Sequence, residues 1–199
     1  MLLYNSTVSG NCYKVRLLFA HLAIPVELRE LSVADRSNRP DVLGGLNPAL
    51  RVPTLILDDG RPLPESGAIL WYFGEGTRFV PEDRYERAQV LQWMFFEQYD
   101  LEPTIAVARF LLHYSDLPRE QYEKRLPRLH EGGTKALAAL ERHLAGREWL
   151  VGDSMSLADI ALYAYTHVAP EAGLDLEPFP NVRAWCDRVA AQPGHVPMA

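Results

Sequence analysis

The stretch VPTLILDDG, at positions 52–60, gives the clearest indication of how this chain folds. Residues 52–57 form a short, mostly apolar run, and Asp58-Asp59-Gly60 is typical of a tight β-hairpin turn. A brief second strand is therefore expected near Pro62-Leu63. Apolar residues after Ser66 then recur at helical spacing, which predicts a helix with Ser66 near its N-cap.

The segment before this hairpin alternates strands and helices. An apolar run at residues 2–4 and a period-two pattern at residues 26–31 predict two strands. Between them, apolar residues from about Asn11 to Leu22 have helical spacing. Residues 35–47 are polar and contain proline and glycine, so a loop with an irregular helix is expected. The predicted element order up to residue 76 is therefore β-α-β-α-β-β-α.

Beyond residue 76 only helical patterns remain. Residues 77–84 are expected to form a linker and residues 85–199 an all-helical domain. The spacing predicts a long helix from Arg84 to about His113, bent or broken at Pro103. A second long helix is expected over 119–145.

Two further helices are expected near the C-terminus. Ser156 is followed three residues later by Asp159, which is typical of a capping box at a helix start. A last helix is predicted over about 181–191. The tail from residue 192, which contains two prolines, is expected to be loosely held.

Composition excludes several classes of protein. Twenty basic and 26 acidic residues give a formal charge of −6, which argues against nucleic acid as the main partner. No apolar run is long enough for a membrane helix, and no basic segment precedes an apolar run at the N-terminus, so a cytoplasmic protein is expected. The two cysteines, Cys12 and Cys186, form neither a disulfide framework nor a zinc site, so no metal is expected.

Three short polar segments fall where open α/β sheets bind ligands, at strand ends and helix starts. Ser9-Gly10-Asn11-Cys12 precedes the first helix, whose free N–H groups favour an anion. Val52-Pro53 heads a strand, and a cis bond there would expose the backbone of Val52. Glu65-Ser66 precedes the third helix and could hold an ammonium and a carboxylate. Each has an ordinary structural explanation, as a cap or an edge proline, but together they suit a small zwitterionic peptide that carries a thiol.

The same segments resemble motifs of the glutathione S-transferase family, and the resemblance extends over the whole chain. Residues 47–55, NPALRVPTL, are similar to the strand entry of the family, and residues 64–69, PESGAI, to its Glu-Ser motif. Residues 152–159 are similar to its C-terminal capping box. The resemblance implies a thioredoxin-like N-terminal domain followed by an all-helical domain, in a homodimer.

The resemblance also implies roles for individual residues. Val52, before a Pro53 expected to be cis, should pair through its backbone with the cysteinyl unit of glutathione. Glu65 and Ser66 should hold the γ-glutamyl end, and Arg51 should face the glycyl end. Asn38 or Arg39 could also reach the glycyl end. Asp159 is expected to be structural.

The catalytic group is less closely matched to the family. Tyr4 lies inside the first strand, so it is discounted as a catalytic tyrosine. Ser9 falls where theta-like and zeta-like enzymes keep a catalytic serine, and Asn11 falls where other classes keep a cysteine. Ser9 is therefore favoured as the hydrogen-bond donor to the glutathione sulfur, with Asn11 assisting or substituting. Cys12 is one position late for a redox role and is expected to pack into the helix.

The implied activity is conjugation of glutathione, bound as its thiolate, to a small hydrophobic electrophile, as in detoxification. Val8, Phe110, His113 and Tyr114 are candidates for the electrophile pocket. An aromatic cluster is instead attributed to core and dimer packing; it comprises Trp93, Phe95, Phe96 and Tyr99. The alternatives are a glutathione-dependent thiol reductase or peroxidase, and a non-catalytic adaptor with the same fold.

Overall fold

The computed structural model describes residues 1–198 and divides into two units. The first unit comprises residues 1–77 together with the tail from residue 193, and the second comprises residues 78–192. The tail therefore belongs with the N-terminal residues rather than with the helices that precede it.

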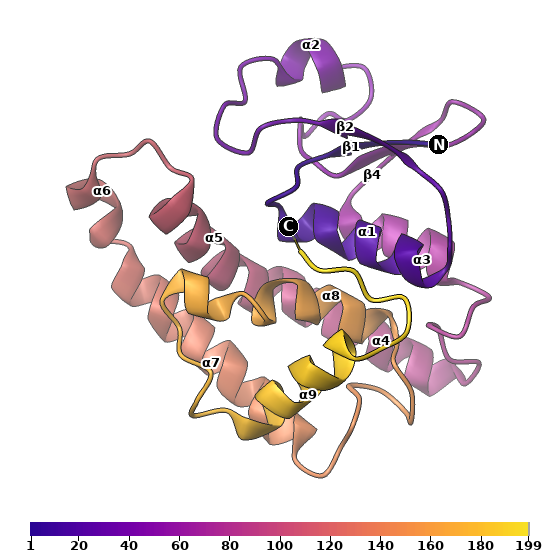
Figure 1. Ribbon diagram of the computed structural model, residues 1–199, viewed down its shortest axis with the longest axis vertical. Helices are drawn as coiled ribbons and strands as arrows, with labels where there is room; N and C mark the ends of the chain where they lie inside the picture. Colours follow the sequence, from indigo (N-terminus) through magenta and orange to yellow (C-terminus); the bar gives the residue numbers. More distant parts are fainter. Residues whose placement is uncertain (199) are drawn as a thin grey trace. The chain divides into compact units, whose positions relative to one another are not determined.

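The first unit is built on a four-stranded mixed sheet (Figure 1). Its strands are β1 (Leu2–Asn5), β2 (Glu27–Glu30), β3 (Thr54–Ile56) and β4 (Pro62–Pro64), in the order β2-β1-β3-β4. Strand β1 is parallel to β2 and antiparallel to β3, and β3 is antiparallel to β4. The hairpin expected over residues 52–63 is thus confirmed as β3 and β4.

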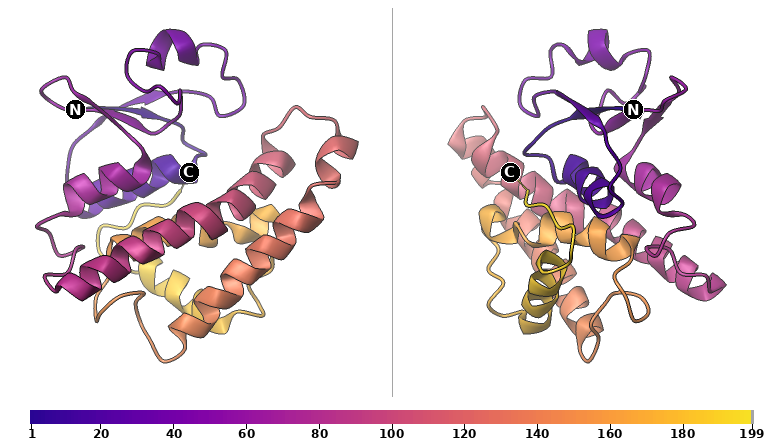
Figure 2. Two further views of the ribbon diagram at one scale, coloured as in Figure 1. Left: turned by 180° about the vertical axis from the view of Figure 1, so that it is seen from behind. Right: turned by 45° about the vertical axis from the view of Figure 1, so that its right-hand side comes forward.

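Helices cover both faces of this sheet (Figures 1 and 2). Helices α1 (Gly10–His21) and α3 (Ser66–Gly74) lie on one face and the short α2 (Arg39–Leu43) on the other. Successive strand residues point to opposite faces, so Leu3 packs in the cluster with α1 and α3 residues, while Tyr4 packs with Leu43 of α2. The predicted order β-α-β-α-β-β-α is confirmed, and the unit has the thioredoxin-like fold.

Helices alone make up the second unit, residues 78–192. They are α4 (Arg84–Phe96), η1 (Glu97–Leu101), α5 (Glu102–His113), α6 (Arg119–Glu123), α7 (Leu126–Leu144), α8 (Leu157–Thr166), η2 (Ala169–Ala172) and α9 (Pro180–Ala190). Every residue of α8 is buried, and α4, α5 and α9 pack against it.

Two prolines explain how the predicted long helices are divided. The break expected at Pro103 takes the form of a π-helical turn, η1, just before it. Proline has no N–H to donate within a helix, so the preceding turn changes its hydrogen-bond pattern. The single helix expected over 119–145 is wrong, because the structure has α6 and α7 there. Pro127 lies in the first turn of α7. N–H groups in the first turn have no partner within the helix, so the missing N–H of proline costs no hydrogen bond there.

Asp159 organises the start of α8, and its capping box with Ser156 is confirmed. One carboxylate oxygen accepts from the Leu150 N–H at 3.1 Å and from Trp185 Nε1 at 2.8 Å. The other accepts from the Ser156 N–H at 2.8 Å and from its hydroxyl at 2.9 Å. Burial raises the pKa of Asp159, and the four hydrogen bonds act in the opposite direction. This carboxylate therefore serves the fold.

The C-terminal tail is held against α1, so the expectation of a loosely held tail is wrong for residues 193–196. The Tyr13 hydroxyl donates to the Val196 carbonyl at 2.7 Å and lies 3.2 Å from His195 Nε2. His21 Nδ1 lies 3.0 Å from the Pro193 carbonyl. Tyr13 is fully buried, and a buried phenol needs hydrogen-bond partners, which the tail supplies.

Candidate functional site

Ser9 is the N-cap of α1, directly after the loop that follows β1. Its Oγ accepts a hydrogen bond from the Cys12 N–H at 3.3 Å, and its own N–H donates to the Ser6 carbonyl at 3.0 Å. The capping bond occupies only a lone pair, so the hydroxyl proton can still be donated to a ligand. Ser9 is partly exposed. Its side chain also contacts that of Cys12, so the Ser9 hydroxyl lies at the helix start beside the buried thiol.

A charged network holds the loop that presents Ser9. Arg16 on α1 donates to the Asn5 side chain at 2.7 Å and to the carbonyls of Ser6 and Thr7 at 3.2 and 2.9 Å. The Glu30 carboxylate accepts from the Asn5 side-chain amide and from the Thr7 N–H. Sequence reasoning did not single out Arg16 or Glu30. In the sequence, Arg16 is a charged residue within an apolar helix and Glu30 a charged residue at a strand end. Charged residues in such positions are ordinarily expected to face solvent.

The N-terminus of α3 meets the N-terminus of α1 at Asn11. The Ser66 hydroxyl donates to Asn11 Oδ1 at 3.4 Å, although the two residues are 55 positions apart in the sequence. Lys14 Nζ donates to the same oxygen at 2.7 Å. Glu65, just before α3, is exposed and has a φ of 75°. A non-glycine residue in this region is strained, and such strain concentrates at functional sites.

The loop before β3 is fixed by Asn47. The Asn47 side-chain amide donates to the Arg51 carbonyl at 3.0 Å and to Thr54 Oγ1 at 2.9 Å. The Val52-Pro53 peptide bond is cis, as expected. Since Thr54 pairs with Pro64, continuing the antiparallel register would set Val52 opposite Ser66. Val52 therefore lies at the same end of the sheet as the start of α3.

The candidates for the glycyl end differ in their surroundings. Arg51 and Asn38 are exposed. Arg39 is only 4% exposed, and its guanidinium donates to the Leu50 carbonyl at 3.0 Å and to the Ser32 carbonyl at 2.7 Å. Arg39 therefore ties two loops together, and Asn38 is the more exposed of these two candidates.

Cys12 packs into α1 as expected. It is fully buried, and its Sγ accepts from the Ser6 N–H at 3.3 Å. Burial raises the pKa of the Cys12 thiol to about 11, and contacts with Ser9, Ser6 and Arg16 only partly oppose this. Burial also raises the pKa of Cys186, and the nearby Asp187 adds to the effect. Neither thiol has the exposure or the lowered pKa of a reactive cysteine.

We expect neither cysteine to react with a chromogenic disulfide reagent in the native protein at pH 8. With a pKa of about 11, the Cys12 thiol is ionised to only about one part in a thousand at that pH. Because the pKa is raised, an appreciable fraction of the Cys12 thiol ionises only when the pH approaches about 11. Absorbance of the released reagent measures labelling, and unfolding in denaturant should expose both thiols. Rapid native labelling of Cys12, identified by mass spectrometry, would contradict the buried assignment.

Candidates for the electrophile pocket fall in both units. Val8 lies beside Ser9 in the first unit, while Phe110, His113 and Tyr114 lie at the C-terminal end of α5 in the second.

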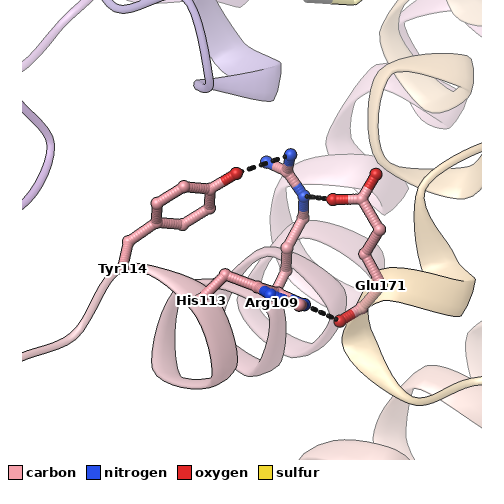
Figure 3. Close-up of polar contacts among 4 residues, drawn as sticks. All are labelled: Arg109, His113, Tyr114 and Glu171. Carbon is pink, nitrogen blue, oxygen red and sulfur yellow. Dashed lines mark hydrogen bonds and ion pairs between the residues drawn. The ribbon is translucent and has the colours of Figure 1, made fainter.

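Figure 3 shows how Arg109, which sequence reasoning missed, joins the end of α5 to η2. Its guanidinium donates to Glu171 Oε2 at 2.7 Å and to the Tyr114 hydroxyl at 3.0 Å. His113 Nε2 lies 2.7 Å from the Glu171 carbonyl. Because Tyr114 accepts from Arg109, its own proton can be donated elsewhere. His113 and Tyr114 therefore both take part in the contacts that join the end of α5 to η2.

The described residues, 1–198, contain no group of three or more His, Cys, Asp or Glu side chains that could hold a metal ion. None of their helices is both long and apolar enough to span a membrane.

Comparison with known proteins agrees with this architecture. Residues 3–77 match the glutathione S-transferase N-terminal domain family, and residues 95–193 match the glutathione S-transferase C-terminal domain family. The structure of a glutathione S-transferase from Pseudomonas fluorescens Pf-5 is 45% identical, with a TM-score of 0.93, covering 99% of this chain and 98% of that one.

Two further similar proteins are named for activities other than glutathione transfer. The disulfide-bond oxidoreductase YfcG of Escherichia coli K12 is 28% identical over 195 residues, 92% of this chain and 87% of that protein. The structure of a maleylacetoacetate isomerase from Methylobacterium extorquens AM1 with bound malonate and glutathione is 27% identical, with a TM-score of 0.80, covering 99% of this chain and 100% of that one. The chain belongs to the glutathione S-transferase family.

Proposed function

We propose that this protein binds glutathione as its thiolate and conjugates it to a small hydrophobic electrophile. The contact between Ser66 and Asn11 carries the proposal, because it joins the N-termini of α1 and α3. Each helix start favours negative charge. Glutathione offers two suitable anions, the thiolate and the γ-glutamyl carboxylate, with an ammonium group beside the second.

The proposed roles follow from these positions. Ser9, assisted by Asn11, donates a hydrogen bond to the glutathione sulfur at the start of α1. Ser66 and the N–H groups at the start of α3 bind the γ-glutamyl carboxylate. The exposed Glu65 carboxylate binds the ammonium group.

The rest of the tripeptide is assigned to the loop before β3. The backbone of Val52, held before Pro53, pairs with the cysteinyl unit. The exposed Arg51 faces the glycyl carboxylate.

Modest interactions are enough to ionise the bound thiol. An ordinary thiol has a pKa near 8.5, and lowering it by two units requires about 2.7 kcal/mol of differential stabilisation. A charge-assisted hydrogen bond contributes roughly 1.5 to 3 kcal/mol, and the field of the helix end adds to it. The thiol proton passes to solvent, the sulfur forms a bond to the electrophilic carbon, and the leaving group departs with its electron pair.

Disulfide or peroxide reduction is the second candidate, because one relative is a disulfide-bond oxidoreductase. The same bound thiolate could attack a disulfide sulfur or a peroxide oxygen instead of carbon. The burial of Cys12 and its raised pKa disfavour a route through a protein thiol. An adaptor without catalysis is disfavoured because Arg51, Glu65 and Ser66 are all retained.

An assay series separates these activities. Retention on immobilised glutathione, with turnover of a generic aryl halide, is expected for the transferase. Turnover of a low-molecular-weight disulfide or hydroperoxide in place of the aryl halide would favour the reductase or peroxidase, and retention without any turnover would favour the adaptor. Glu65→Ala should weaken retention at least tenfold, because one charged hydrogen-bonded contact is lost. Glu82→Ala, at an exposed acid between α3 and α4, is the matched control.

We also propose that the protein is a cytoplasmic homodimer, with α4 in the interface. Tyr85, Phe95 and Tyr99 are 71%, 66% and 86% exposed, which is unusual for large aromatic side chains. Helical periodicity sets the three on one side of α4 and η1. Two reduced, buried cysteines suit a reducing compartment.

A further inference from the structure

Lys14 is a buried charged residue to which the mechanism so far assigns no role. It lies on α1, three residues after Asn11, and its side chain is only 1% exposed. Lysine is among the residue types that are almost never fully buried unless paired. Lys14 lies one turn from the proposed sulfur site and contacts Asn11, so its charge bears directly on that site.

The contacts around Asn11 determine which way its amide faces. Lys14 Nζ approaches Asn11 Oδ1 to 2.7 Å, and the Ser66 hydroxyl approaches the same atom to 3.4 Å. An ammonium group can only donate, so the atom facing Lys14 must be the amide oxygen. A flipped amide would set its NH₂ group against the ammonium, donor against donor. The Asn11 Nδ2 group is therefore held pointing away from Lys14 and Ser66.

We propose that Lys14 is a positioning residue that locks the Asn11 amide so that its NH₂ group donates to the sulfur of bound glutathione. The inference rests on the function proposed above. Without the lock, the amide oxygen could face the sulfur in part of the population. An oxygen there would repel the thiolate, whereas the NH₂ group stabilises it.

The lock also links the two ends of the ligand. The Ser66 hydroxyl has one proton, which it donates to the Asn11 oxygen here and, in the proposed function, to the γ-glutamyl carboxylate once that carboxylate is bound. Binding of the γ-glutamyl carboxylate would therefore change the hydrogen bonds made by Asn11, the residue proposed to contact the sulfur. Lys14 holds Asn11 in the same orientation whether or not Ser66 is engaged by ligand.

The test measures the pKa of the bound glutathione thiol from the ultraviolet absorbance of its thiolate during a pH titration. Variants Lys14→Met, Asn11→Ala and the double variant are compared with wild type, with Lys124→Met as control for loss of an exposed lysine. Asn11→Ala should raise the bound-thiol pKa by about one unit, a tenfold change in the acid dissociation constant of the thiol, since it removes one charge-assisted donor. Lys14→Met should raise it by a similar amount, and the double variant by no more than either.

The outcomes of this titration distinguish failure of the proposed function from failure of the positioning role of Lys14. A wild-type protein that takes up no glutathione, or leaves its thiol pKa unchanged, overturns the proposed function itself. With a wild type that does lower this pKa, an unchanged value in folded Lys14→Met overturns the positioning role. Additive shifts in the double variant overturn it as well, because Lys14 would then act without Asn11.

A second variant covers the case in which Lys14→Met does not fold. Asn11→Asp keeps oxygen acceptors for Lys14 and Ser66 but replaces the NH₂ donor with an oxygen. It should raise the bound-thiol pKa at least as much as Asn11→Ala, while binding of S-methylglutathione, which has no ionisable thiol, stays within a few-fold of wild type. A wild-type thiol pKa in Asn11→Asp would show that the amide does not donate to sulfur and would overturn the proposal.

Discussion

Replacing Ser9 with alanine should lower turnover of an aryl halide about 10-fold at a pH below the pKa of the bound thiol, the rate equivalent of about 1.4 kcal/mol. Alanine removes the hydroxyl that donates to the sulfur, so less of the bound thiol is ionised. Affinity for glutathione should change only a few-fold. Near neutral pH the free thiol is mostly protonated, so its ionisation on the protein adds little to the total binding energy. Steady-state kinetics and calorimetry measure the two effects separately.

Ser9→Thr is the matched control, because threonine keeps both the hydroxyl and the helix cap. It should retain most of the activity that Ser9→Ala loses. Loss of the cap at α1 costs about 1 kcal/mol of stability, and thermal unfolding of each variant detects this contribution. If Asn11→Ala proves crippling and Ser9→Ala mild, then Asn11 rather than Ser9 is the principal donor to sulfur.

Replacing Asp159 with alanine should lower the free energy of unfolding by about 4 kcal/mol, near the upper end for a single substitution. The carboxylate accepts from Leu150, Ser156 and Trp185, all buried. Its removal leaves their donors without acceptors, at about 1 to 3 kcal/mol for each buried group. For a chain of 199 residues this corresponds to a fall in melting temperature on the order of 10 °C.

Two comparisons sharpen this prediction. Trp185→Phe removes one donor while leaving the carboxylate, so its loss should be about half as large or smaller. Asp153→Ala, at an exposed acid in the loop before α8, should stay within about 0.5 kcal/mol of wild type. Denaturant unfolding provides all three values. An Asp159→Ala protein within 1 kcal/mol of wild type would show that the buried network does not hold the start of α8.

The fold could be predicted from the sequence because its strongest signals are local. Alternation at residues 26–31, the turn at residues 58–60 and the helical spacing after Ser66 each lie within a few residues. Pro127 was missed because proline in the first turn of a helix leaves the apolar spacing intact. The tail was missed because its partners, Tyr13 and His21, lie more than 170 residues away in sequence.

The sequence allowed the residue types of the candidate site to be predicted, but not the contacts that those residues make with one another. Serine, asparagine and glutamate before helices indicated a ligand for helix starts. The contact of Ser66 with Asn11 spans 55 residues, and that of Arg109 with Glu171 spans 62, so no local pattern reveals them. Lys14 illustrates the same limit, because a lysine within a helix ordinarily points to solvent.

Calorimetric titration with glutathione near pH 7, in two buffers of different ionisation enthalpy, tests the central claim most directly. In this account the protein binds the tripeptide and keeps its sulfur ionised. We predict saturable uptake with release of a large fraction of one proton for each site filled, because a thiol lowered by about two pKa units is mostly ionised at that pH. Absence of uptake at millimolar glutathione, or uptake without proton release, would contradict the claim.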